Sequence, residues 1–259
     1  MMRQSAKSTQ SIRKISVHKI ALGSGIAAAL IFAVGSICIG MYVFSPPAVH
    51  HLALPSNLIS LDSDLGQRLL FESHTQQNYV MLSQQFQTQK LPAYCGVASG
   101  AIVLNALDPS ARPWNQDTFF TPAAQKIRSP YLVALLGMSL AQLAALLKSH
   151  QVQVETHYAA ETTLEQFRTH IKENLARDRD FVIVNYERAG IGQVNGGHIS
   201  PIAAYHEASD RFLIEDVSSY KYPPVWVSAT DLWRATNTID ITSLRTRGYL
   251  LVRQSAAAH

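Results

Sequence analysis

The sequence contains little cysteine, and this shortage excludes several classes of protein. Its 259 residues include two cysteines, Cys38 and Cys95, which is too few for a disulfide-rich scaffold. A bridge between them would require their backbones to come within about 7 Å. Cys38 lies in an apolar run outside the globular part of the sequence, so no structural disulfide is expected. Cys and His residues with zinc-ligand spacing are also lacking, so no metal site is predicted.

The sequence lacks a basic stripe that could follow a phosphate backbone. Lys and Arg total 22 against 18 Asp and Glu, but the excess is confined to residues 1–19. The rest of the chain is close to neutral, so we expect no nucleic-acid partner. Long Ser, Gln, Gly or Pro tracts are absent as well, which argues against disorder or a repeat array and favours one globular domain.

An uncharged apolar run extends from Ile20 to Phe44 and is long enough to cross a hydrocarbon core of about 30 Å. The basic residues 1–19 predict a cytoplasmic N-terminus, with the rest of the chain in the periplasm of a bacterium. The run is longer than the apolar core of a cleaved signal peptide, so we predict an uncleaved inner-membrane anchor over residues 20–44. The proline-containing residues 45–60 are interpreted as a linker, and residues 61–259 as the folded domain.

Hydrophobic periodicity predicts an α+β domain, with helices in its first half and an antiparallel sheet in its second. Ser139 with Gln142, and Thr163 with Gln166, have the spacing of capping boxes, and apolar residues follow both pairs at helical intervals. β-rich runs begin later in the chain, at Phe181, His198, Arg211 and Gly248. Four residues, EASD, separate the second and third runs, so these two strands are expected to be neighbours in a hairpin.

Cys95 precedes the apolar run GVASGAIVLNAL and is predicted to open a helix. The free amides and the positive dipole at a helix N-terminus stabilise a thiolate, so we expect a lowered pKa and a nucleophilic thiol. Gly96 would let a substrate backbone approach closely. A lone cysteine is more often a small buried hydrophobic residue, so this position needs partners before it indicates catalysis.

The partners of a thiol nucleophile are a proton carrier and an orienting carboxylate. Gly197-His198 and, one hairpin later, Asp216 supply both, in the order Cys, His, Asp. Gln89, upstream of Cys95, offers an amide for the oxyanion. The pattern alone leaves other readings open: His170 and His206 remain alternatives for the base, and Asp216 is equally compatible with a role at a strand end.

Several segments together resemble the phytochelatin synthases, a family of transpeptidases with a papain-like fold. They are QTQKLPAYCGVASGAIVLNAL around Cys95, GGHISPIAAY around His198, DVSSYKYPPVWVSATDLWRAT from Asp216, and TID with RTRGYLLV near the end. The resemblance implies that Cys95, His198 and Asp216 form a triad and that Gln89 is the oxyanion donor. It also implies that Asp240 and Arg247 hold a γ-glutamyl group through its ammonium and carboxylate, with Gly96 and Gly197 beside the substrate.

The implied reaction cleaves the Cys-Gly bond of glutathione and passes γ-Glu-Cys to water or to a second glutathione. The resemblance implies no tightly bound cofactor, whereas a heavy-metal ion (Cd, Zn or Cu) would enter as a glutathione thiolate complex, because soft ions such as Cd²⁺ favour sulfur. The alternatives are a papain-like peptidase for larger peptides and a non-catalytic periplasmic binding protein. A homodimer is left open.

Overall fold

The computed structural model describes residues 32, 34–36, 39–73 and 76–255. Two units are distinguished, Met1–Ser45 and Pro46–His259. The described residues of the first unit are helical as far as Phe44, but most of the predicted anchor lies outside the described residues. Within the described part of the chain, no helix reaches the length and apolarity that crossing a membrane requires.

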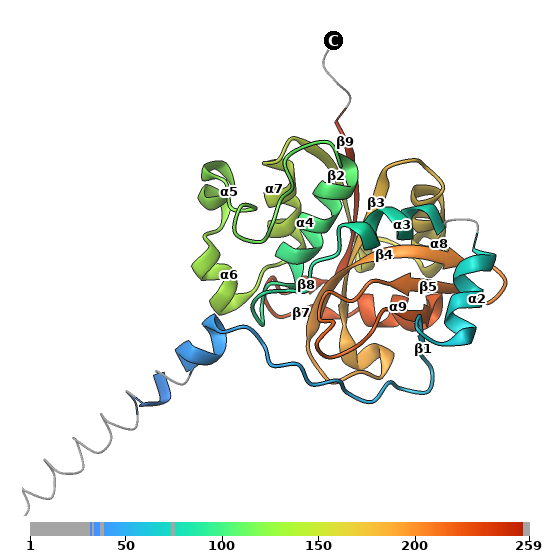
Figure 1. Ribbon diagram of the computed structural model, residues 1–259, viewed down its shortest axis with the longest axis horizontal. Helices are drawn as coiled ribbons and strands as arrows, with labels where there is room; N and C mark the ends of the chain where they lie inside the picture. Colours follow the sequence, from blue (N-terminus) through green and yellow to red (C-terminus); the bar gives the residue numbers. More distant parts are fainter. Residues whose placement is uncertain (1–31, 33, 37–38, 74–75, 256–259) are drawn as a thin grey trace, which may run out of the picture. The chain divides into compact units, whose positions relative to one another are not determined.

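The second unit combines helices with antiparallel strands (Figure 1). Its α-helices are α2 (Asp64–Glu72), α3 (Gln76–Gln84), α4 (Cys95–Leu107), α5 (Pro122–Ile127), α6 (Pro130–Leu136), α7 (Leu140–Lys148), α8 (Leu164–Leu175) and α9 (Ala229–Thr236). Its strands are β1 (Ile59–Ser60), β2 (Val152–Tyr158), β3 (Asp180–Glu187), β4 (Gly197–His206), β5 (Arg211–Ile214), β6 (Val225–Ser228), β7 (Ile239–Asp240), β8 (Arg245–Thr246) and β9 (Gly248–Gln254). Short 3-10 helices occur at η1 (Ala159–Glu161) and η2 (Arg188–Ile191).

Seven strands form one antiparallel sheet in the order β1-β6-β5-β4-β3-β9-β2. Strands β7 and β8 make a separate two-stranded ribbon. The prediction of mixed helices and antiparallel strands is therefore confirmed. β4 and β5 are direct neighbours joined through Glu207–Asp210, as the EASD spacing predicted.

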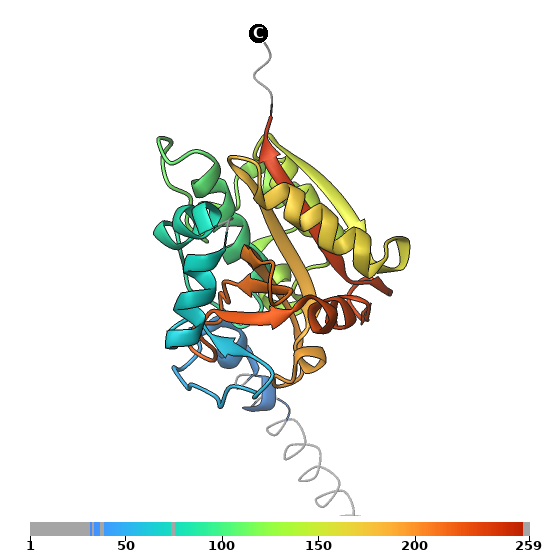
Figure 2. The same cartoon turned by 90° about the vertical axis from the view of Figure 1, so that its right-hand side faces the viewer.

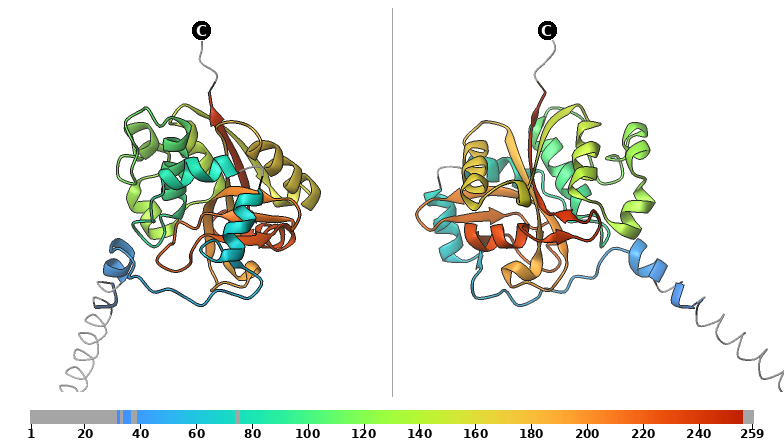
Figure 3. Two further views of the ribbon diagram at one scale, coloured as in Figure 1. Left: turned by 45° about the vertical axis from the view of Figure 1, so that its right-hand side comes forward. Right: turned by 180° about the vertical axis from the view of Figure 1, so that it is seen from behind.

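Helices cover both faces of the sheet (Figures 2 and 3). On one face, Phe167 and Ile171 of α8 and Leu232 of α9 pack into a cluster with Val182 and Val184 of β3. On the other face, α4 packs against β3, β4 and β9, and α7 packs against β2. The apolar run after Cys95 therefore becomes a buried helix, because the sheet and α7 enclose it from different sides.

Local sequence signals explain where two of these helices start. The Ser139 hydroxyl accepts from Gln142 N, while the Gln142 side chain accepts from Ser139 N. Thr163 and Gln166 make the same reciprocal pair at the start of α8. Each capping box satisfies backbone amides that a first helical turn leaves unpaired, so both predicted helix starts are confirmed.

The segment interpreted as a linker is attached to the second unit. The backbone N–H groups of His50 and Leu52 donate to the carbonyls of Tyr220 and Lys221 at 2.9 and 3.0 Å. Farther along, Ile59 and Ser60 pair with β6 as strand β1. The folded unit thus begins at Pro46, and the predicted boundary at residue 61 is too late, because main-chain hydrogen bonds already hold the preceding residues.

Candidate active site

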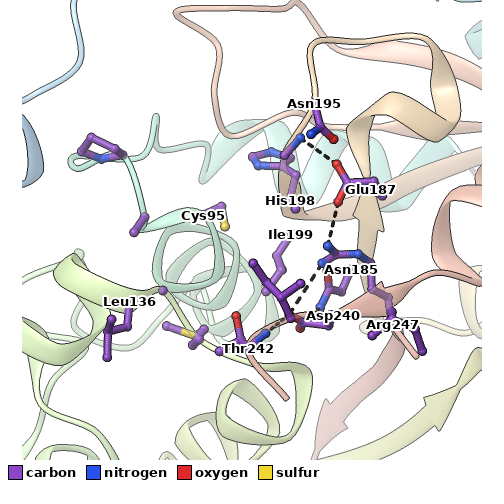
Figure 4. Close-up of a pocket in the computed structure, with 18 of the residues that line it drawn as sticks. Cys95, Leu136, Asn185, Glu187, Asn195, His198, Ile199, Asp240, Thr242 and Arg247 are labelled. Atoms are coloured by element: carbon purple, nitrogen blue, oxygen red, sulfur yellow. Dashed lines mark hydrogen bonds and ion pairs between the residues drawn. The ribbon is translucent and has the colours of Figure 1, made fainter. Parts of the chain in front are cut away.

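Cys95 is the first residue of α4 and lines a cavity of about 480 Å³. Tyr94 precedes it without a side-chain cap, so the first-turn amides of α4 are not satisfied by a capping side chain. The backbone amides of Ile199 and Gly96 lie close enough to the thiol to favour its charged form. The nucleophile candidate is thereby held against β4, directly beside His198 (Figure 4).

His198 and Asp216 form a buried pair at 2.9 Å between Nε2 and Oδ1. Both side chains are almost inaccessible, at 4% and 0% exposure. The Ser200 hydroxyl also lies 2.9 Å from Nε2, and Tyr186 packs edge-on against the imidazole. The structure therefore unites the predicted Cys95, His198 and Asp216, with one ring nitrogen of His198 directed at the carboxylate.

Arg188 completes this group, although the sequence reasoning did not identify it. Its Nη1 and Nη2 donate to Oδ2 and Oδ1 of Asp216, both at 2.8 Å, in a bidentate pair. Nη1 also donates to Gln193, and the guanidinium lies over the Tyr222 ring. Arg188 itself is 5% exposed. A buried carboxylate is tolerated here because a buried cation matches it with two hydrogen bonds. We call Cys95, His198, Asp216 and Arg188 the triad cluster.

The pKa shifts in the triad cluster differ from the expectation for the Cys95 thiol. Burial raises the pKa of the Cys95 thiol, and this effect is larger than the lowering of the pKa by the Ile199 and Gly96 amides. Burial and the charge of Arg188 lower the pKa of His198 to about 4, against the pull of Asp216. Burial alone would raise the pKa of Asp216, but the His198 and Arg188 charges bring it below its usual range. The shift of the thiol pKa is therefore opposite to the expected lowering, because desolvation outweighs the nearby amides and the charge of Arg188.

A second group of polar side chains lines the same cavity. Asn185 bridges Arg247 and Asp240: its Oδ1 accepts from Arg247 Nη1 at 3.1 Å, and its Nδ2 donates to Asp240 Oδ2 at 3.2 Å. Arg247 Nη2 pairs with Glu187 at 2.7 Å, and Nη1 lies 4.0 Å from Asp240. The structure thus brings the predicted Asp240 and Arg247 together and adds Asn185 and Glu187. We call these four residues the head-group cluster.

Gly197 belongs to the cavity, whereas Gly96 does not. A Cβ atom on Gly197 would lie 2.7 Å from Nη1 of Arg247, so glycine is what allows the backbone to rest on the guanidinium. The corresponding position on Gly96 is filled by the Met138 sulfur at 2.7 Å. Gly96 thus lets α4 pack closely against Met138, and its substrate contact stays a prediction.

Gln89 is held away from the cavity wall. Its Nε2 donates to the carbonyls of Leu91 and Pro92 at 2.9 and 2.8 Å, and its Oε1 accepts from the Ser218 hydroxyl at 2.7 Å. The residue is 3% exposed and ties the segment before Cys95 to the segment after Asp216. To act as the predicted oxyanion donor, the Gln89 amide would have to break its hydrogen bond to Leu91 or Pro92 and donate to the substrate oxyanion instead.

The two histidines left open by the sequence lie in other environments. His170 Nδ1 is 2.7 Å from the Tyr249 hydroxyl, and its ring packs near His157. His206 contacts Ser209 and Glu72 at the end of β4. Neither lines the cavity that contains Cys95, so the structure selects His198.

The residues that sequence reasoning missed share a recognisable signal. Asn185, Glu187 and Arg188 follow directly on the apolar run FVIV of β3. Polar side chains in a buried strand require hydrogen-bond partners, since burying an unpaired donor or acceptor costs free energy. The segment NYER therefore indicated a buried polar site. The residues that bind its side chains lie within positions 193–247, so the sequence pattern could not identify them.

The two clusters have the composition and arrangement of a Cys-His-Asp thiol site that faces a charged binding pocket. Comparisons with known proteins agree with this class. The phytochelatin synthase family model matches residues 49–249, so the chain belongs to the phytochelatin synthase family.

Curated relatives carry transferase names. Glutathione gamma-glutamylcysteinyltransferase 3 of Lotus japonicus is 35% identical over 214 residues, covering 80% of this chain and 43% of that protein. Glutathione gamma-glutamylcysteinyltransferase 1 of Triticum aestivum is 35% identical over 221 residues, with 83% and 42% covered. The chain therefore spans less than half the length of these relatives.

Among solved structures, xylellain, a cysteine protease from Xylella fastidiosa, aligns with 82% of this chain and 92% of its own. The TM-score is 0.41 and the identity 10%. This likeness is too distant to assign the fold.

Proposed function

We propose that this chain is a cysteine acyltransferase that cleaves the Cys-Gly bond of glutathione and transfers γ-Glu-Cys. One observation carries the proposal: the helix-terminal Cys95, the His198 ring that Asp216 holds from behind, and the Asp240–Arg247 pair meet at one cavity of about 480 Å³, which Cys95, His198, Asp240 and Arg247 line. Family membership and the names of the relatives support the substrate class.

The first half-reaction forms a thioester. His198 keeps Nε2 on Asp216, which leaves Nδ1 to take the proton of the Cys95 thiol. The sulfur attacks the carbonyl carbon of the Cys-Gly bond, and the tetrahedral oxyanion collapses as the imidazolium gives its proton to the departing glycine nitrogen. The lowered pKa of His198 keeps the imidazole neutral at pH 7, so a lone pair is available for the thiol proton, and it makes the imidazolium a strong acid toward the departing glycine nitrogen.

The second half-reaction regenerates the thiol. Water or the α-amine of a second glutathione attacks the thioester carbonyl, His198 takes the nucleophile's proton, and the protonated imidazole returns it to the departing Cys95 sulfur. Water yields free γ-Glu-Cys, whereas the amine yields a lengthened peptide. The open side of the cavity, next to Leu136 and Ile241, leaves room for either acceptor.

The remaining assignments complete the proposal. The papain-like arrangement, the inner-membrane anchor over residues 20–44 and the periplasmic catalytic domain are proposed from the sequence. Heavy-metal ions are proposed to enter bound to glutathione thiolate, as part of the substrate.

The test is product analysis with the full chain. Reduced glutathione, with and without Cd²⁺, is incubated with the protein and with Cys95→Ser, and products are identified by mass spectrometry. We expect glycine with γ-Glu-Cys or longer (γ-Glu-Cys)n-Gly peptides, and none from Cys95→Ser. Intact glutathione in the presence of reduced protein would refute the substrate assignment.

A further inference from the structure

Glu187 is a second carboxylate in the head-group cluster, in addition to Asp240, and the predicted pairing of Asp240 with Arg247 gives it no role. It is the last residue of β3, lines the cavity, and retains 21% side-chain exposure. Its two carboxylate oxygens have separate partners: Oε1 accepts from Gly196 N at 2.6 Å and Oε2 from Arg247 Nη2 at 2.7 Å. Figure 4 shows the side chain on the cavity wall between Asn195 and Arg247.

The charge of the cluster is unbalanced. Two carboxylates, Glu187 and Asp240, face a single guanidinium, Arg247, which gives a net charge of −1 among these described groups. A ligand that brings a cation is therefore favoured. One that brings only a carboxylate must place it beside two negative groups.

Arg247 can still bind a carboxylate in this arrangement. Among the described residues, its Nε donates to Thr238, and one hydrogen each of Nη1 and Nη2 is given to Asn185 and Glu187. The second hydrogens of Nη1 and Nη2 remain for a ligand, because a guanidinium has five donors. The pocket thus offers donors for an anion and, next to them, carboxylate lone pairs for a cation.

We propose that Glu187 is a specificity-determining residue that, with Asp240, makes the pocket select a zwitterionic α-amino-acid head group over the same head group without its ammonium. The inference rests on the proposed glutathione substrate and assigns it a recognition element. The ammonium lies between the two carboxylates, while the substrate carboxylate takes the remaining donors of Arg247. Without the ammonium, the charge of Glu187 repels the ligand.

The test compares two ligands that differ only in this amine, glutathione and glutaryl-Cys-Gly. Their dissociation constants are measured by calorimetry on the full chain carrying Cys95→Ser, with and without Glu187→Gln. We expect the Cys95→Ser protein to prefer glutathione, and Glu187→Gln to reduce that preference about tenfold, the size of one charge-assisted hydrogen bond. Glu161→Gln is the matched control, because Glu161 pairs with Arg245 at 2.8 Å on the exposed surface; its preference should not change.

The outcomes distinguish two possible roles of Glu187: binding the ammonium group of the substrate, and positioning the guanidinium of Arg247. If Glu187 only positions the guanidinium, Glu187→Gln weakens both ligands equally and the preference stays constant, which would overturn the inference. Glu187→Asp, which keeps the charge, should retain most of the preference. Turnover of glutathione by the unmodified chain is measured in parallel: failure there refutes the proposed reaction, whereas the binding ratio decides the role of Glu187.

Discussion

The triad cluster and the head-group cluster each contain one arginine and at least one carboxylate, but they differ in how completely these charges are paired. Arg188 and Arg247 are equally buried, at 5% exposure each. Arg188 matches a single carboxylate, Asp216, with two bonds of 2.8 Å. Arg247 divides its donors among Thr238, Asn185 and Glu187 and faces the cavity. Pairing inside the protein keeps the first cluster fixed, whereas incomplete pairing leaves the second able to bind a ligand.

Removing the buried cation should have the largest effect. Arg188→Met leaves the Asp216 charge buried without its partner, so we expect a loss of about 3 to 5 kcal/mol in the free energy of unfolding, measured with urea. The pKa of His198 should also rise, because Arg188 lowers it, and the acid limb of the rate–pH profile should move upward.

The surface pair Arg168–Asp210 provides the matched control. It is also bidentate, through Nε and Nη2 of Arg168, with both bonds at 2.8 Å, but its side chains are 21% and 39% exposed. Arg168→Met should cost at most about 1 kcal/mol. Equal losses in the two variants would show that burial does not distinguish the two pairs.

Glu215, the neighbour of Asp216, tests what a buried carboxyl does without a cation. Burial raises its pKa to about 8, far above the value of an unfolded chain, so the folded protein keeps a proton that the unfolded protein releases. Stability from this group is present below about pH 4.5 and is lost as the pH rises to about 8. Between pH 5 and pH 8, Glu215→Gln should remove a slope on the order of 1 kcal/mol per pH unit. An unchanged slope in urea titrations would contradict this.

Changing the cavity arginine should have the smallest effect on folding and a clear effect on binding. Arg247→Lys keeps the charge but loses the planar fork, so KM for glutathione should rise about tenfold with little change in kcat. Arg245→Lys, on the neighbouring ribbon and exposed, should leave KM unchanged. A fall in kcat at constant KM would place Arg247 in the chemical step instead.

Local signals were sufficient for much of the fold. The capping boxes at Ser139 and Thr163, the helix after Cys95 and the β4–β5 hairpin were predicted because each depends on neighbouring residues. Strand β2 was missed, although it pairs with β9 along its whole length. Its sequence VQVETHY alternates β-branched or aromatic residues with polar ones, so the period-2 signal of a strand was present in the sequence and was overlooked.

The sequence by itself determined the order of Cys95, His198 and Asp216, because this order depends on residue identity and spacing. Its resemblance to the family implied both the family membership and the pairing of Asp240 with Arg247. Only the tertiary structure decided that Arg188 neutralises Asp216, that Glu187 joins the head-group cluster, and that Gln89 ties the segment before Cys95 to the segment after Asp216. It also reversed the expected shift in the thiol pKa. Burial and contacts between distant segments arise from the packed chain, and no local pattern encodes them.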